Sequence, residues 1–233
     1  MGANYQGKYY EMDYAVDMVF VIDATGSMRP ILDTVKNNAL NFYGDFAEKM
    51  NKKNKPVKNV RIRVIAFRDY AFDKERAMMV TDFFNLPSQA KEFSDCLHSI
   101  QPFGGGDDPE DGLEALAYAI KSKWNMDAVK KRHVIVLWTD DGTHDLGFGK
   151  NVNNYPKGMA KDFDELTQWW GSKSRKGLMD EASKRLLLFT PDKESYSSIY
   201  NTWSNVVWYE SEAGKGLESV GYEQILDVIA NSI

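Results

Sequence analysis

The chain has 233 residues, of which 43% are apolar and 27% are charged, a balance that indicates a globular protein and excludes a disordered one. Its formal charge of −5 and its scattered lysines and arginines lack the basic footprint of a nucleic-acid-binding domain, so no nucleic-acid partner is expected. The single cysteine, Cys96, excludes an intrachain disulfide. No run approaches the roughly 18 apolar residues that span a membrane, and the amino terminus lacks a signal-peptide run, so we expect a cytoplasmic protein without membrane contacts.

Short apolar, β-branched runs alternate along the chain with stretches of helical spacing. Residues 1–13 show neither pattern and are expected to form a tail before one domain spanning 14–233. Helical spacing of apolar residues runs over 29–50, 112–119 and 222–233. The predicted strands are 16–22, 60–67, 77–82, 133–139, 185–190 and 206–209. Strands that alternate with helices predict a parallel sheet with helices on both faces.

One connection between predicted strands is too short for a helical crossover. Only nine residues separate Phe67 from Ala77, so the third strand should run antiparallel at one edge of the sheet. The predicted fold class is therefore α/β, a doubly wound, Rossmann-like and mostly parallel six-stranded sheet with one antiparallel edge strand. The hairpin tip, residues 68–73, points toward the edge of the sheet where the carboxyl ends of the parallel strands lie, and is a candidate contact surface.

Two of the most apolar predicted strands end in aspartate, the first at Asp23 and the fourth at Asp140. In open α/β sheets, ligands bind beyond the carboxyl ends of the strands. Two carboxylates brought together without a cation repel each other, and a bound metal ion relieves that repulsion. Thr25 and Ser27 add hydroxyl oxygens, while Gly26 lets the backbone turn before the helix. An Asp-Ser/Thr loop alone is equally explained by a helix cap, and the second acidic strand end favours the metal.

The predicted shell consists of oxygen atoms only, which suits Mg²⁺, Mn²⁺ or Ca²⁺ and disfavours Zn²⁺. We expect one divalent cation, with Mg²⁺ the preferred ion. A third segment, residues 103–110, combines three glycines with acidic residues immediately before the helix at 112–119. It is either a turn with an acidic helix cap or a further part of the ion site, and Asp107 is its candidate ligand.

The segments VFVIDATGSM and VIVLWTD resemble the first and fourth strands of von Willebrand factor A domains. The resemblance covers almost the whole chain and implies a metal-ion-dependent adhesion site of the bacterial Asp-x-Thr-Gly-Ser type, with Asp23, Thr25, Ser27 and Asp140 as ligands. In that family the hydroxyls bind the ion directly, the aspartates often act through water, and a partner's carboxylate completes the octahedron. Many members also place a threonine after two glycines in the middle loop. This chain resembles a subset with aspartate there, so Asp107 should replace that threonine.

The resemblance implies a non-enzymatic, metal-dependent protein–protein interaction module in a bacterial stress, conflict or signalling system. Its partner would be a protein that supplies an acidic residue to the metal. One alternative is a Mg²⁺-dependent phosphohydrolase of the haloacid dehalogenase type, although those enzymes place a general acid where this chain has Thr25. The other alternative is a structural subunit with a vestigial metal site.

The segment after Asp140 leaves the sheet at the same edge and is rich in glycine, asparagine and aromatic residues. His144, which lies near Asp141 and Asp145, raises the alternative of a second metal. Trp170 fits a helix that packs on the sheet. The roles of Tyr155 and Trp169, in the core or at an interface, stay open.

Overall fold

The computed structural model describes residues 13–104 and 109–233. Of the predicted tail at residues 1–13, all but Asp13 lie outside the described residues. A seven-stranded sheet forms the centre of the fold, in the order β3-β2-β1-β5-β6-β7, with β4 also paired to β2. The strands are β1 (Tyr14–Asp23), β2 (Val57–Phe67), β3 (Met78–Val80), β4 (Phe84–Leu86), β5 (Lys131–Trp138), β6 (Lys184–Thr190) and β7 (Val206–Glu210).

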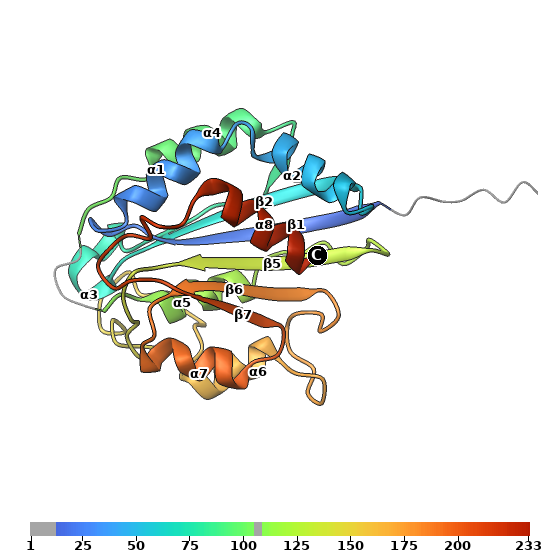
Figure 1. Ribbon diagram of the computed structural model, residues 1–233. Helices are drawn as coiled ribbons and strands as arrows, with labels where there is room; N and C mark the ends of the chain where they lie inside the picture. The colour runs from blue at the N-terminus through green and yellow to red at the C-terminus, as the bar shows by residue number, and fades with distance from the viewer. Residues whose placement is uncertain (1–12, 105–108) are drawn as a thin grey trace, which may run out of the picture.

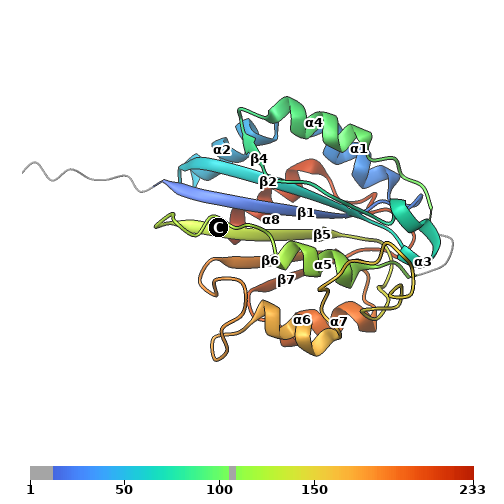
Figure 2. The same ribbon diagram turned by 180° about the vertical axis from the view of Figure 1, so that it is seen from behind.

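Helices cover both faces of the sheet, as Figures 1 and 2 show from opposite sides. One face carries α1 (Arg29–Asn38), α2 (Phe42–Lys52), α4 (Ala90–Ser99) and α8 (Tyr222–Ser232). The other face carries α5 (Gly112–Ile120), α6 (Phe163–Trp170) and α7 (Glu194–Thr202). A short helix, α3 (Tyr70–Asp73), lies at the end of β2. The predicted doubly wound α/β class is confirmed.

The central strands are buried on both faces, which explains their nearly continuous apolar sequences. From Ala15 to Asp23 every residue of β1 is buried, and β5 is buried from His133 to its end. Side chains at alternate positions enter two separate cores, one under each layer of helices. Trp138 lies in the first core and Trp170, as predicted, in the second, both fully buried.

The antiparallel edge beside β2 is confirmed, but it is divided into β3 and β4 where the sequence predicts a single strand. Thr81 lies directly after β3. Its backbone N–H donates to the carbonyl of Val64 at 3.0 Å, and its hydroxyl oxygen accepts from the N–H of Val64, also at 3.0 Å. Because a side chain takes this position in the ladder, regular pairing stops there and resumes at Phe84.

The predicted helical stretch at 29–50 is two helices, α1 and α2, with a turn between them. The N–H groups of Ala39 and Asn41 donate to the carbonyls of Lys36 and Asn38, which tightens the chain into i−3 hydrogen bonds. Leu40, which the sequence places on the apolar stripe, is 61% exposed at this turn. The stripe therefore contacts the sheet in two parts.

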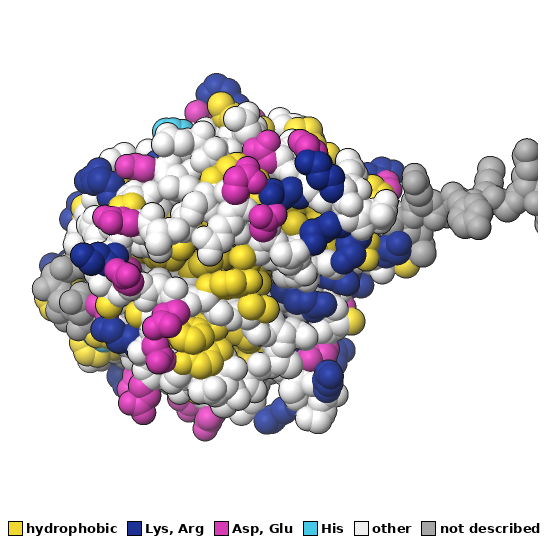
Figure 3. All heavy atoms as spheres, in the orientation of Figure 1, with side chains coloured by type: hydrophobic (Ala, Val, Ile, Leu, Met, Phe, Trp, Pro, Cys, Tyr) yellow, Lys and Arg dark blue, Asp and Glu magenta, His cyan; other side chains and the backbone are white. Residues whose placement is uncertain are grey.

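The sheet ends at β7, which pairs with β6 alone within the described residues. Val207 on this strand is 42% exposed. Figure 3 shows acidic and basic side chains interspersed over this face, with apolar side chains gathered near α8 and β7. The charged side chains of this face do not form a stripe of one sign.

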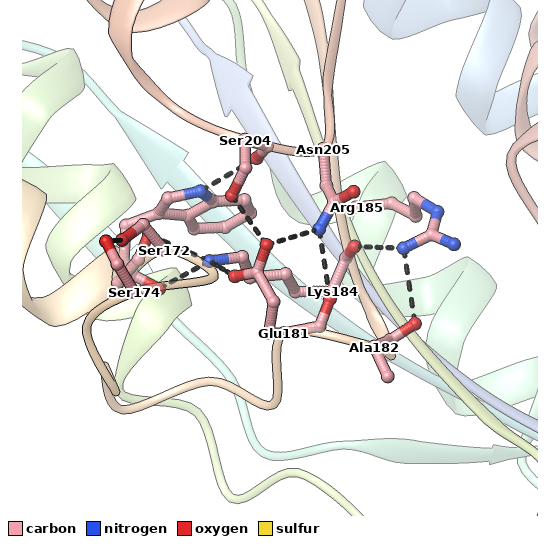
Figure 4. Close-up of polar contacts among 10 residues, drawn as sticks. Ser172, Ser174, Glu181, Ala182, Lys184, Arg185, Ser204 and Asn205 are labelled. Carbon is pink, nitrogen blue, oxygen red and sulfur yellow. Dashed lines mark hydrogen bonds and ion pairs between the residues drawn. The ribbon is translucent and has the colours of Figure 1, made fainter.

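The start of β6 is held by a buried lysine (Figure 4). The side chain of Lys184 is inaccessible to solvent and donates to the carbonyls of Trp170 and Gly171 at 2.8 and 3.0 Å. It also forms an ion pair with Glu181 at 2.5 Å, and Glu181 accepts a second hydrogen bond from Ser204 at 2.8 Å. The carbonyls at the end of α6 and the loop before β6 are thereby joined around one cation.

Candidate metal site

Asp23 and Asp140 emerge side by side because β1 and β5 are parallel neighbours. The last paired residues are Ile22 and Trp138, so both aspartates follow at the carboxyl end of the sheet. Asp23 is 1% and Asp140 2% exposed, although both line an open cavity of about 460 Å³. Among the described residues, the lining is Asp23, Thr25, Gly26, Ser27, Gly104, Glu110, Asp140, Asp141, Lys193, Ala213 and Gly214.

The loop after β1 folds back on Asp23 and fixes its carboxylate. Oδ1 accepts hydrogen bonds from the backbone N–H of Thr25 at 2.9 Å and from its hydroxyl at 2.7 Å. Oδ2 accepts from the hydroxyl of Thr139, the last residue before Asp140, at 2.7 Å. Burial raises the pKa of Asp23 to about 6 against the opposing effect of these donors, and the charge of Asp140 adds to the increase. The site therefore holds a carboxylate whose charge is only partly stabilised.

Ser27 connects the two strand ends. Its hydroxyl donates to Asp140 Oδ1 at 3.0 Å and lies 3.4 Å from the hydroxyl oxygen of Thr25. The other oxygen of Asp140 accepts from the N–H of Gly216 at 2.7 Å, and the N–H of Gly214 donates to the Asp140 carbonyl at 2.9 Å. The structure thus brings the predicted residues Asp23, Thr25, Ser27 and Asp140 into one network, which the loop before α8 closes.

Of the predicted ligands, Asp107 lies outside the described residues. Glu110, which belongs to the acidic segment 103–110 but is not itself a predicted ligand, lines the cavity and is 2% exposed. Glu110 Oε2 is buried and has no hydrogen-bond partner among the described residues. Burial, followed by the charges of Asp23, Asp69 and Asp73, raises the pKa of Glu110 to about 9. No signal in the sequence separates Glu110 from the other acidic residues before α5, whose N-cap residue is Asp111.

Arg68, a buried cation beside this site, forms no ion pair with a carboxylate in the described part of the chain. Its guanidinium donates to the carbonyls of Ala24 and Phe103 at 3.0 Å each, and to that of Gln101 at 2.6 Å. Arg68 is 5% exposed and stacks over the ring of Phe103 at 3.9 Å. It therefore joins the loop after β1 to the segment at 101–104 through neutral oxygens.

His144 is used in a structural contact. Its Nε2 lies 2.8 Å from Asp69 Oδ2, and its ring stacks on Phe148 with 3.8 Å between centroids.

Among the described residues, no three His, Cys, Asp or Glu side chains are grouped so that they could hold a metal ion. With the described residues alone, a metal ion in this cavity would be held by the hydroxyls of Thr25 and Ser27 as well as by carboxylates. Tyr155, whose role the sequence leaves open, donates its hydroxyl to Glu114 at 2.8 Å.

The donor set fits a hard divalent cation. Carboxylate and hydroxyl oxygens line the cavity, and the lysine at its rim, Lys193, is paired with Asp141 at 2.7 Å. Glu110 supplies a buried oxygen without a partner in the described part of the chain. Such oxygens suit Mg²⁺, Mn²⁺ or Ca²⁺ and not a thiolate-seeking ion.

Comparison with known proteins shows the same fold elsewhere. The family model described as von Willebrand factor A domain matches residues 17–155. The α-protein kinase vwkA of Dictyostelium discoideum is 23% identical over 143 residues, 61% of this chain and 21% of that protein. This chain thus spans about a fifth of that relative's length.

Among solved structures, the pilus adhesin SpaC from Lactobacillus rhamnosus GG aligns with a TM-score of 0.50 and 14% identity. The alignment covers 94% of this chain and 30% of the adhesin. Proximal thread matrix protein 1 from the mussel byssus, described with a zinc-occupied MIDAS motif, aligns with a TM-score of 0.49 and 10% identity, over 94% and 48% of the two chains. At these identities the likeness concerns the fold. No helix in the described residues is long and apolar enough to cross a bilayer.

Proposed function

Because this chain belongs to the von Willebrand factor A domain family, we propose that it is a non-enzymatic protein-interaction module that grips its partner through a divalent cation. The carrying observation is the convergence of Asp23, Thr25, Ser27 and Asp140 on one open cavity at the carboxyl ends of β1 and β5. These four residues are the proposed ligands, and the domain that presents them is proposed to span residues 14–233.

Two further acidic residues complete the proposed site. Asp107 is retained as a candidate from the sequence, and Glu110 is added because its buried carboxylate lines the cavity with one oxygen unpartnered in the described residues. When bound, the cation supplies positive charge to the ionised aspartates and a coordination position for a carboxylate of the partner. Mg²⁺ is the proposed ion, with Mn²⁺ and Ca²⁺ as chemically similar substitutes.

The proposed partner is a protein that presents an acidic residue at the cavity mouth. The cavity is open and lined by the proposed ligands, so such a side chain can reach a cation bound there. The proposed setting is a cytoplasmic signalling or stress-response assembly. The resemblance to bacterial family members supports this setting, as does the kinase named among the relatives.

Metal binding is tested by titration calorimetry with Mg²⁺ and Mn²⁺. Asp23→Ala and Ser27→Ala should abolish binding while the circular dichroism spectrum stays unchanged. Asp33→Ala is the matched control, because Asp33 is exposed on the adjacent helix α1. Parental affinity in either Asp23→Ala or Ser27→Ala would show that the cation is held elsewhere.

Partner binding is tested by affinity capture from a native lysate with Mn²⁺, repeated with EDTA and with Asp23→Ala. A partner lost in both repeats supports adhesion through the metal. A partner retained in both contradicts it and moves the interface away from this cavity.

The phosphohydrolase alternative has a specific structural obstacle. Its general acid would occupy the position of Thr25, whose hydroxyl already donates to Asp23. Asp23, the required nucleophile, also accepts from Thr139 through its second oxygen. Release of phosphate from p-nitrophenyl phosphate with Mg²⁺, lost in Asp23→Asn, would establish an enzyme and overturn the proposal of a pure interaction module.

A further inference from the structure

A second cavity, of about 270 Å³, lies apart from the metal site. Its lining is Arg61, Arg63, Asp82, Phe83, Lys121 and Lys123. It lies on the α5 face of the sheet, where the residues that end and follow α5 contact β2. Four cationic side chains and one acidic side chain meet here in a chain whose formal charge is −5. The local charge thus has the opposite sign to that of the whole protein.

The strand geometry explains why the two arginines lie together. Arg61 and Arg63 are two residues apart on β2, so their side chains leave the same face of the sheet. Their neighbours Ile62 and Val64 enter the core on the opposite face. Arg63 lies four residues before the end of β2 at Phe67, which places it about 13 Å from the edge that carries the metal site.

Arg61 is already neutralised and forms a wall of the cavity. Its Nε and Nη2 donate to the two carboxylate oxygens of Asp17 at 2.7 and 2.6 Å. Its guanidinium also lies over the ring of Phe83, 4.5 Å from the centroid. Asp17 is buried, so this pair is fixed in place before any ligand arrives.

Among the described residues, the hydrogen-bond partners of Arg63 are neutral. Its Nε donates to the carbonyl of Thr81 at 2.8 Å and its Nη1 to the hydroxyl of Ser122 at 2.7 Å. Burial lowers the pKa of its guanidinium, with the charge of Asp82 acting against that effect. These two anchors orient the side chain, and a guanidinium that is oriented in advance loses little entropy on binding an anion.

The two lysines raise the positive charge further. Lys121 donates to the carbonyl of Gly158 at 3.0 Å and lies over the ring of Trp169, while Lys123 is exposed. In the described part of the chain, neither lysine nor Arg63 forms an ion pair. With Arg61 neutralised by Asp17, three cations remain opposite the single carboxylate of Asp82. The cavity therefore carries a surplus of two positive charges.

We propose that this cavity binds a phosphate monoester group. A dianion matches the surplus of two charges, and the oriented guanidinium of Arg63 is a planar group of N–H donors that suits phosphate oxygens. The volume is below the range of roughly 300–1,000 Å³ of ordinary small-molecule pockets, which favours a phosphate group over a whole nucleotide. The group can come from a free phosphate ester or from a phosphorylated side chain of a protein.

The test is calorimetry on the full chain in buffer with EDTA, so that no metal contributes. The probes are inorganic phosphate and a phosphoserine peptide, with the unphosphorylated peptide as reference. Saturable binding of either phosphate probe, without binding of the reference, is expected. Equal affinities indicate recognition of the phosphate group alone, and tighter binding of the phosphopeptide indicates a protein source; both results support the proposal.

Variants locate the binding. Arg63→Gln and Lys123→Gln should each weaken it by about tenfold or more, because each removes a charge-assisted hydrogen bond. Lys123 is exposed, so its replacement keeps the fold even if that of Arg63 does not. Lys58→Gln is the control, because Lys58 is an exposed lysine of the same strand outside the cavity. Absence of saturable binding, or an equal loss in Lys58→Gln, overturns the proposal.

Discussion

Replacing Gly216 with alanine should destabilise the domain and weaken metal binding, whereas the same change at Gly214 should do much less. Both glycines lie in the loop before α8 and adopt left-handed backbone angles, with φ of +57° at Gly216 and +68° at Gly214. A Cβ at Gly216 would lie 2.1 Å from the carbonyl oxygen of Ser27 and 2.8 Å from Pro30 Cδ. A Cβ at Gly214 would have no atom within 4 Å.

The magnitude follows from two contributions. A left-handed backbone costs a residue with a Cβ about 1–2 kcal/mol, and both variants share this cost. The contact with a backbone oxygen adds about 1–3 kcal/mol at Gly216 alone, as in other overpacked sites. The Gly216→Ala variant should therefore lose about 2–5 kcal/mol of unfolding free energy. Since about 1 kcal/mol shifts the Tm of a domain of this size by roughly 2–4 °C, thermal unfolding separates the two variants.

Calorimetry with Mn²⁺ supplies the second readout. The N–H of Gly216 donates to Asp140, and Ser27 forms the opposite wall, so displacement of the loop also moves two proposed ligands. Only Gly216→Ala should bind Mn²⁺ more weakly than the parent. Equal Tm values and equal affinities in the two alanine variants would refute the idea that this loop positions the site.

Three further predictions concern buried carboxyl groups and single hydrogen-bonded side chains. Without metal, the unfolding free energy measured in urea titrations should fall as pH rises from about 4 to 9. Burial raises the pKa values of Asp23 and Glu110 to about 6 and 9, so the folded protein loses stability when these two carboxyl groups ionise. Saturating Mn²⁺ should make the unfolding free energy depend less on pH. Thr139→Val removes a hydrogen bond to Asp23 and should weaken Mn²⁺ binding roughly 10–100-fold in calorimetry. Lys184→Met leaves the buried carbonyls of Trp170 and Gly171 without their donor and should cost about 2–3 kcal/mol in urea denaturation, with Mn²⁺ affinity unchanged.

The fold and the centre of the site could be predicted because local sequence and tertiary structure agree there. The runs that form β1 and β5 are apolar on both faces, and only a central parallel strand buries both. Once these strands are neighbours, Asp23 and Asp140 must emerge at one edge, and the Thr25 and Ser27 hydroxyls follow within one turn of chain. Strand polarity predicts that the two aspartates meet, and the loop sequence with its family resemblance adds the two hydroxyls.

The remaining features depend on contacts between distant segments. The apolar stripe at 29–50 does not reveal that Leu40 meets solvent, since periodicity records side-chain type and not the turn that divides α1 from α2. Glu110 looks like one more acidic residue before a helix, and only its burial beside the strand ends distinguishes it. The basic cavity joins β2 to the end of α5, segments about 60 residues apart, as the hydrogen bond from Arg63 to Ser122 shows.

The described cations near Asp23 bind other groups, so no side-chain cation among them balances the negative charge of its carboxylate. Arg68 is buried close enough to contact the loop after Asp23, yet its hydrogen bonds go to backbone carbonyls, and Lys193 pairs with Asp141 at the rim. Had Arg68 paired with Asp23, the carboxylate would be satisfied and its pKa lowered, whereas burial raises it to about 6. Arg68 thus joins the loops without pairing with a described carboxylate, and the two charges of the proposed divalent cation would balance those of Asp23 and Asp140.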